Sequence, residues 1–173
     1  MNSTPYNEDT EFNLRMQPFA DAIYRRIWRL EGIKRNLGKL DKDRGIDVIL
    51  MGKSGLTNAL QEKFRRYKYR TYQQFTIEYK NNPLTNEPGE FYKLAANYYF
   101  YGYSKEDGMG FYQWWIVNLN KFKDAYEKGS IRPDEIMENK KHGHASFLCF
   151  NFDRLDNVLA LQSSNRRLSF LGF

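Results

Sequence analysis

The chain has 173 residues, of which 28% are charged and 17% are aromatic, and it carries a formal net charge of +6. Its length allows one domain with a hydrophobic core and excludes two domains of ordinary size, and its apolar and aromatic content excludes a disordered chain. The basic balance favours a polyanionic partner such as nucleic acid.

The N-terminal residues 1–10 are polar and contain Pro5. We therefore predict a flexible tail, followed by one domain over residues 11–173. The sequence shows neither a secretory signal peptide nor an apolar run of about 18 residues, so we expect no secretion by that route and no membrane insertion. The single cysteine, Cys149, lies among apolar residues and predicts a buried structural thiol. We expect a cytoplasmic protein.

Apolar residues at helical spacing follow the tail. Phe19, Ile23, Ile27 and Leu30 recur at steps of three and four, which predicts a helix over Phe12–Leu30 that ends near Gly32. The charged segment KLDKDRG predicts a turn. Three strands separated by turns come next: Ile46–Met51, Leu60–Tyr69 and Gln74–Tyr79.

The second half of the chain alternates between helical and strand patterns. After a loop at Pro83–Pro88, a helix begins at Glu90, and aromatic runs whose side chains we assign to the core predict two more strands. These strands, the helix after them and the last clear strand are Tyr98–Tyr103, Phe111–Trp115, Val117–Lys128 and Ala145–Phe152. The order predicts a single α/β domain with a small mixed central sheet flanked by helices.

An acid and a Gln-x-Lys triplet stand on two consecutive predicted strands. Asp47 begins the first strand, and Gln61 and Lys63 share one face of the next. If these strands are neighbours, the three side chains converge at one edge of the sheet. Oxygen ligands suit Mg²⁺ or Mn²⁺, and a lysine near the attacking water suits phosphodiester hydrolysis. The pattern therefore predicts a metal-dependent phosphodiesterase site.

With Asp47 and Gln61-Glu62-Lys63, the sequence resembles the PD-(D/E)XK phosphodiesterase superfamily over roughly residues 19–79. The resemblance implies a restriction-endonuclease-like core and a Mg²⁺-dependent DNA endonuclease, with Asp47 and Gln61 as metal ligands and Lys63 assisting the water. Two positions depart from the pattern. Gln61 stands where the family commonly has Asp or Glu, as in some homing endonucleases, and Ile46 stands where it has proline.

The glutamine removes one negative charge from the predicted site, so another carboxylate should compensate. Glu62, next to it, is one candidate. Asp21, in the first predicted helix, is placed as the helical acid that many members of the superfamily add, with Glu31 as its rival. Glu78, on the third predicted strand, is a further alternative, although a surface carboxylate explains it equally well.

Cations alternate with aromatic residues immediately after the triplet. We predict that they hold DNA phosphates while the aromatics stack on bases, and the alternative is a solvated strand edge protected by charge. The predicted phosphate-binding residues are Arg65, Arg66, Lys68 and Arg70.

Two other motifs receive a plainer interpretation. His142 and His144 form an H-x-H pair without a third ligand nearby, which indicates an exposed loop. The segment MGKSG at 51–55 lacks the spacing of a phosphate-binding loop.

Two alternative functions remain open from the sequence. One is a catalytically inactive member of the same superfamily that binds DNA or acts in phage assembly. The other is a basic globular protein that binds a protein partner through exposed aromatics. The C-terminal residues 154–173 either dock on the core or join subunits, and cutting both DNA strands would favour a homodimer.

Overall fold

The computed structural model describes residues 5–35, 38–53, 55–82, 85–139 and 145–163. The helices are α1 (Pro5–Ile27), α2 (Lys39–Arg44), α3 (Glu90–Lys93) and α4 (Leu119–Glu127), with short 3₁₀ helices η1 (Tyr67–Tyr72) and η2 (Phe152–Arg154). The strands are β1 (Leu30–Lys34), β2 (Val48–Gly52), β3 (Thr57–Arg65), β4 (Gln74–Asn82), β5 (Glu87–Pro88), β6 (Tyr98–Ser104), β7 (Phe111–Asn118), β8 (Glu135–Glu138), β9 (Ser146–Asn151) and β10 (Leu159–Gln162).

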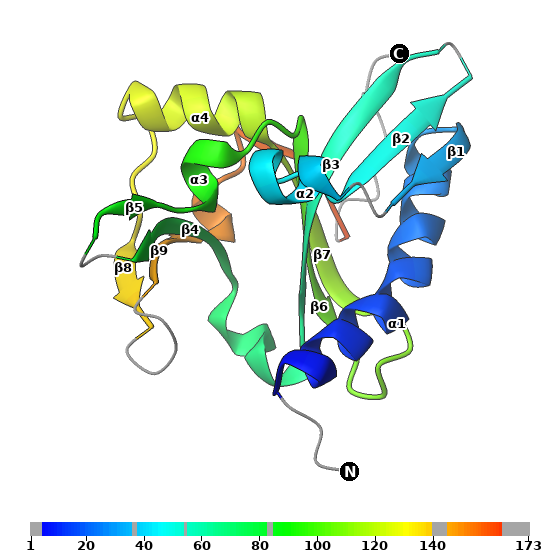
Figure 1. Ribbon diagram of the computed structural model, residues 1–173, viewed down its shortest axis with the longest axis horizontal. Helices are drawn as coiled ribbons and strands as arrows, with labels where there is room; N and C mark the ends of the chain where they lie inside the picture. The colour runs from blue at the N-terminus through cyan, green and yellow to red at the C-terminus, as the bar shows by residue number, and fades with distance from the viewer. Residues whose placement is uncertain (1–4, 36–37, 54, 83–84, 140–144, 164–173) are drawn as a thin grey trace.

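These elements form one mixed α/β domain with two sheets. The larger sheet has the order β1-β2-β3-β6-β7-β10, in which only β3 and β6 run parallel, and the smaller antiparallel sheet has the order β5-β4-β9-β8. Figure 1 shows α1 along one face of the larger sheet and the smaller sheet, with α3 and α4 beside it, on the other. The predicted mixed sheet is confirmed, but a second sheet, which the sequence did not indicate, covers most of one face.

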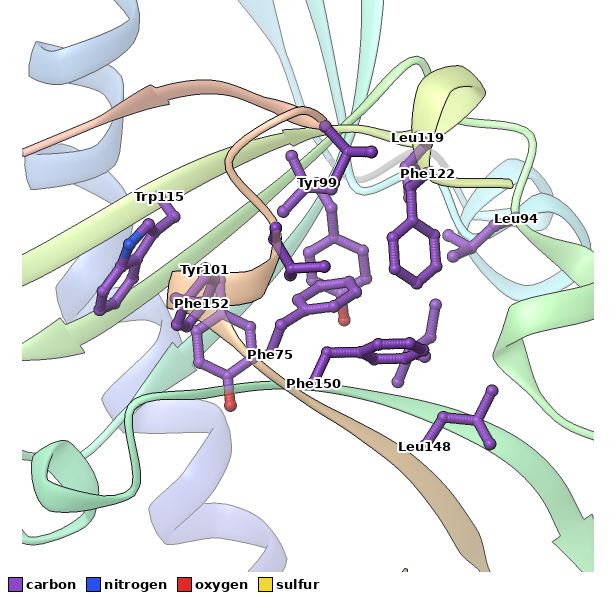
Figure 2. Close-up of a cluster of buried hydrophobic side chains, with 14 of the residues drawn as sticks. Phe75, Leu94, Tyr99, Tyr101, Trp115, Leu119, Phe122, Leu148, Phe150 and Phe152 are labelled. Atoms are coloured by element: carbon purple, nitrogen blue, oxygen red, sulfur yellow. The ribbon is translucent and has the colours of Figure 1, made fainter. Parts of the chain in front are cut away.

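The core between the two sheets is largely aromatic (Figure 2). Trp115 of β7 stacks on Phe152 with ring centroids 3.7 Å apart and planes 3° apart. The ring centroids of Phe75 in β4 and Tyr101 in β6 lie 5.9 Å apart. The aromatic runs of β6 and β7 therefore fill the core, as predicted. Cys149 is free and buried, which confirms its interpretation as a structural thiol.

Helix α1 packs against the opposite face of the larger sheet. Met16, Ala20 and Tyr24, four residues apart, are fully buried, and Ala20 and Tyr24 share a cluster with Val48 and Leu60. The predicted stripe lies one position to the side of this row, where its residues are half-buried. The helix stops at Ile27 instead of near Gly32, because residues 30–34 pair with β2 as strand β1.

The prediction of an irregular tail over residues 1–10 is wrong from Pro5 onward, where α1 begins. Proline is accepted in the first turn of a helix, because the N–H that it lacks has no partner within the helix there. Buried Phe12 begins the inward face of this helix only two turns later. Residues 8–11, which precede Phe12, are exposed, so this part of the helix shows no apolar periodicity in the sequence.

Short elements account for the remaining differences from the predictions. Residues 39–44 form α2 and not a simple turn, and Tyr67 and Tyr69 belong to η1 and not to β3. The strands β1, β5, β8 and β10 were not predicted; β5 lies in the segment expected to be a loop. In the C-terminal segment, Leu155 and Leu161 are buried and β10 pairs with β7, so residues 155–162 dock on the core. Among the described residues, no helix has the length and apolar character needed to cross a membrane.

Candidate functional site

The β2–β3 hairpin positions Asp47 and Gln61. Its register pairs Val48 with Leu60, so Asp47, which precedes β2, lies opposite Gln61. The backbone N–H of Asp47 donates to the carbonyl of Leu60 at 2.9 Å, and the N–H of Glu62 donates to Asp47 Oδ2 at 2.8 Å. These two hydrogen bonds fix the Asp47 carboxyl group against the edge of β3.

Period-two alternation along β3 then separates two sets of side chains. Leu60 belongs to the cluster packed on α1, whereas Lys63 and Arg65 reach Thr76 of the smaller sheet. Gln61 alternates with Leu60 and so lies on the same side as Lys63. The hairpin therefore places Gln61 opposite Asp47 and on the same face of β3 as Lys63.

A cleft of about 440 Å³ runs along the exposed edge of β3. It exists because β2 stops pairing at Leu60, so residues 61–65 have a strand neighbour, β6, on one side only. Asp47, Lys63 and Arg65 line this β3 cleft together with the first half of α1. Gln61 is not among the residues that line it and lies deeper.

The Asp47 carboxyl group is poised to hold either a proton or a cation. Burial raises its pKa to about 8, and a hydrogen bond with the Asp41 carboxyl and the negative charges of Glu62 and Asp41 act in the same direction. The backbone hydrogen bond from Glu62 opposes the shift. The carboxyl groups of Asp47 and Asp41 therefore lie side by side, and a bound cation would reduce the repulsion between them.

The Gln61 side chain carries an unsatisfied oxygen. Its Oε1 is buried and has no hydrogen-bond partner among the described residues. A Cβ added at Gly45, two residues before Asp47, would lie 3.5 Å from this atom. Leaving such an oxygen unpaired costs about 1–3 kcal/mol, so the position is explained either by a ligand or by a strain that the fold tolerates.

Lys63 is a desolvated amine between the two sheets. Its Nζ lies 3.4 Å from the carbonyl oxygen of Thr76 and 5.2 Å from the centroid of the Phe147 ring. Burial, followed by the positive charge of Arg65, lowers its pKa to about 8, although Glu90 and Glu78 partly offset this. An amine with this pKa exchanges protons readily near neutral pH.

Glu90 is a half-buried carboxyl group that the sequence analysis missed. It accepts a hydrogen bond from the Tyr99 hydroxyl at 3.2 Å, and Tyr99 is the partner of Gln61 in the parallel β3–β6 pair. Burial raises the pKa of Glu90, and the positive charge of Lys63 opposes that rise. Nothing in the local sequence links residue 90 to residue 63, because only the β6 pairing and the short helix α3 bring them close.

The other face of β3 carries an ion-pair network centred on Arg35. The Arg35 guanidinium contacts Asp21 Oδ1 at 2.5 Å and Glu62 Oε2 at 2.6 Å, and the Tyr24 hydroxyl donates to Glu62 Oε1 at 2.6 Å. Desolvation opposes the charge of Arg35, but these two carboxylates outweigh it and raise the pKa of the guanidinium. Both carboxylates proposed to complete a metal site are therefore held by an arginine that sequence reasoning did not single out.

The other two alternative acids lie apart from each other. Glu31 is exposed on β1. Glu78 on β4 is half-buried, and its negative charge is close enough to Lys63 to raise the pKa of that amine, against the effect of burial. Of these two, only Glu78 belongs to the neighbourhood of the β3 cleft.

Of the four predicted phosphate-binding cations, two line the cleft and two lie on η1, whose Tyr69 also lines it. Arg65 is held inside by Tyr101 and Thr76, and Arg66 pairs with exposed Asp9 at 3.0 Å. Lys68 and Arg70 belong to η1 and lie against tyrosine rings, with the Arg70 guanidinium 3.7 Å from the Tyr67 centroid. Arg65 and Arg66 line the cleft itself.

The two minor motifs have different outcomes. MGKSG spans the end of β2 and the turn before β3, where the N–H of Gly55 donates to the carbonyl of Gly52 at 3.0 Å. It is a hairpin turn and precedes no helix. His142 and His144 lie outside the described residues.

Acidic, histidine and cysteine side chains do not form a group of three that could hold a metal ion in the part of the chain that the structure describes. The carboxylates that line the cleft are those of Asp9, Asp41, Asp47 and Glu62, of which Glu62 is paired with Arg35 and Asp9 with Arg66. Comparisons with protein-family models, with curated proteins and with solved structures find no match to this chain.

Proposed function

We propose that the protein is a metal-dependent DNA endonuclease of the PD-(D/E)XK type. The observation that carries this proposal is the β3 cleft, in which Asp47, Lys63 and Arg65 line one hollow of about 440 Å³. Gln61, opposite Asp47 in the hairpin, carries a buried oxygen without a partner among the described residues. The cleft combines oxygen donors for a hard cation with side-chain cations for a phosphate. Phosphodiester hydrolysis needs these two kinds of group together.

The oxygen donors suit Mg²⁺ or Mn²⁺. Mg²⁺ is bound through one or two carboxylates, with water and substrate phosphate completing its shell, so a cluster of three acids is not required. Asp47, with Asp41 beside it, would supply the carboxylate, and Gln61 Oε1 is an oxygen that lacks another partner. When bound, the ion would neutralise phosphate charge and activate water.

Lys63 has the assisting role in this proposal. Its lowered pKa allows it to hold or release a proton near neutral pH, and it lies next to Arg65 on the same face. Arg65 and Arg66 would contact the phosphate at the cleft, while Lys68 and Arg70 of η1 would contact neighbouring phosphates. Cations in this arrangement would place the DNA strand along the edge of β3.

Glu62 and Asp21 act as positioning residues in the proposed site. Both carboxylates bind Arg35, and a metal ion would have to displace that guanidinium to reach them. The backbone N–H of Glu62 meanwhile orients Asp47. We also propose a cytoplasmic location and, if both strands of a duplex are cut, a symmetric homodimer.

The test is cleavage of supercoiled plasmid and of branched DNA in Mg²⁺, Mn²⁺ or EDTA. The wild type should cut only with metal. Asp47→Ala should lose more than about 100-fold in rate, the upper loss seen when even an outer-shell partner of a metal site is removed. Circular dichroism and thermal unfolding of each protein verify that it is folded. Cutting that persists in EDTA or in Asp47→Ala would contradict the proposal.

A catalytically silent DNA-binding or phage-assembly protein is the second candidate. The observation that favours it is the glutamine at position 61, together with the raised pKa of Asp47, which reduces the negative charge available to a metal. This candidate predicts DNA binding that weakens steeply with salt and no cleavage on any substrate in any metal. The same assay, with a binding measurement beside it, separates the two.

A further inference from the structure

A second, smaller hollow adjoins the β3 cleft. Its volume is about 240 Å³, and Arg65 and Tyr69 line both hollows. We call it the tyrosine pocket, and its main lining residues are Arg65, Tyr69, Tyr72, Tyr101, Tyr103 and Met137. A ligand that contacts Arg65 in the cleft therefore has direct access to a mainly aromatic compartment.

The floor of the tyrosine pocket is rigid. Tyr101 and Tyr103, on the inner face of β6, are buried, and their ring centroids lie 5.7 Å apart. Arg65 Nε donates to the Tyr101 hydroxyl at 2.9 Å, and Arg65 Nη2 donates to Thr76 Oγ1 at 2.8 Å. These hydrogen bonds hold the guanidinium at the boundary between pocket and cleft, where it can serve both.

The mouth of the pocket is lined by exposed apolar side chains. Tyr72 is 63% exposed, Met137 41% and Tyr69 38%, although all three are large and apolar. The rings of Tyr69 and Tyr72 lie 6.4 Å apart at 36°. Exposed apolar groups gathered around a hollow indicate a binding surface, and flat rings at its mouth suit a flat ligand.

The size and polarity of the pocket restrict that ligand. A volume of about 240 Å³ lies below the range of about 300–1,000 Å³ typical of sites for drug-sized molecules, so one ring system fits better than a larger compound. The hydroxyls of Thr76, Tyr101 and Tyr103 are hydrogen-bonded within the protein, so the exposed Tyr69 and Tyr72 are the tyrosines that can reach the edge of such a ring. Arg65 adds attraction for an anionic group attached to it.

We propose that the tyrosine pocket binds one unpaired nucleobase of a DNA strand whose phosphate occupies the β3 cleft. The inference rests on the proposed function only in placing a phosphate there. A base inside a duplex is stacked and paired, and removing it costs a few kcal/mol, whereas a single strand presents it freely. The substrate class is therefore single-stranded or branched DNA in preference to an intact duplex.

The experiment measures binding in EDTA, so that cleavage plays no part. Fluorescence anisotropy compares a labelled 12-nucleotide oligothymidylate, an abasic strand of the same length and charge, and a duplex. The proteins are the wild type, Tyr72→Ala, Met137→Ala and the control Tyr92→Ala, whose tyrosine is 56% exposed on α3, outside the pocket. Tyr72 and Met137 are exposed, so their variants should fold.

Tyr72→Ala should weaken binding of the oligothymidylate about 5- to 100-fold, the effect of losing one base–aromatic stack. Met137→Ala should cause a smaller loss, and Tyr92→Ala should cause none. Binding of the abasic strand and of the duplex should be unchanged in all variants. Equal losses on the abasic strand, or no loss on any strand, would overturn the inference, as would a wild type that binds no oligonucleotide.

The outcome separates this inference from the proposed endonuclease activity. If the wild type never cuts DNA in Mg²⁺ but Tyr72→Ala weakens binding of the oligothymidylate, the endonuclease proposal is rejected and the base-binding pocket is supported. If the wild type cuts DNA but binds the oligothymidylate and the abasic strand equally, the endonuclease proposal is supported and the base-binding pocket is rejected.

Discussion

The two faces of β3 treat their polar side chains differently. On the face toward α1, Glu62 is paired with Arg35 and Tyr24 by contacts of 2.6 Å, and Asp21 joins the same arginine. On the face toward the smaller sheet, Gln61 Oε1 has no partner in the described part of the chain, and Lys63 is desolvated beside another cation.

This contrast separates a structural from a functional arrangement. A fully paired network stabilises the contact of α1 with the sheet, because each buried charge has a partner of opposite sign. A face with an unpaired oxygen and a cation of lowered pKa costs stability, and such costs gather at functional sites. Arg35 and Glu62 line the β3 cleft together with Lys63, so both kinds of group border one cleft, and we assign the paired ones to the fold and the unpaired ones to the chemistry.

The largest expected effect tests the functional face. Lys63→Met removes the ammonium and keeps a side chain of similar length, so DNA cleavage should fall by about 10²–10⁴-fold, the usual contribution of a proton-transferring group. The free energy of unfolding should stay equal or rise, because a desolvated charge is removed. Lys121→Met, at an exposed position on α4 outside the β3 cleft, is the control in both measurements. A cleavage rate within twofold of the wild type would remove Lys63 from the site.

The next effect tests the paired face. Arg35→Met leaves Asp21 and Glu62 without their cation and should lower the free energy of unfolding by about 3 kcal/mol. The matched variant Arg66→Met breaks the exposed pair with Asp9 and should cost only about 0–1 kcal/mol. Urea titration measures both. Equal costs for the two variants would show that the Arg35 network is no more stabilising than a surface ion pair.

A pH dependence of stability should follow from Asp47. Its pKa, about 8 in the folded protein, lies above the ordinary aspartate value, so the folded state binds the proton more tightly. The resulting stabilisation is complete below about pH 4 and is lost as the pH rises through about 8. Because the Asp47 side chain is only half-buried, solvent screening reduces the effect, and we expect a loss of about 2 kcal/mol over this range.

Urea titrations in EDTA at several pH values measure this loss. Asp47→Asn should remove most of the dependence, since its amide can donate to Asp41 at every pH. A wild type whose stability rises steadily from pH 4 to pH 8, with Asp47→Asn behaving identically, would contradict the assigned proton.

The smallest effect concerns the unpaired oxygen. Gln61→Leu replaces a buried amide with an apolar side chain of similar size and should raise the free energy of unfolding by about 1 kcal/mol, because an unsatisfied polar group is removed. Gln61→Glu should instead destabilise the metal-free protein and bind Mn²⁺ more tightly. Thermal unfolding with and without Mn²⁺ tests both variants, and a Gln61→Leu protein less stable than the wild type would indicate that Oε1 has a partner.

Local pattern predicts the β2–β3 hairpin and the common face of Gln61 and Lys63, because these residues are close in sequence and alternate on short strands. The sequence does not predict what depends on distant pairing. Arg35 reaches Glu62 through the β1–β2 pair, and Glu90 reaches Lys63 only because β6 lies parallel to β3. The sequence also does not predict the smaller sheet, because its strands β5 and β8 are exposed, short and without apolar alternation.

The central claim is that a cation binds at Asp47 and not at the Arg35 network. Electron paramagnetic resonance of Mn²⁺ titrated into the protein measures this directly. We predict that the wild type and Asp21→Asn bind Mn²⁺ alike and that Asp47→Asn weakens binding by about 10-fold or more. Binding that survives in Asp47→Asn, or that is absent from the wild type, would contradict the claim.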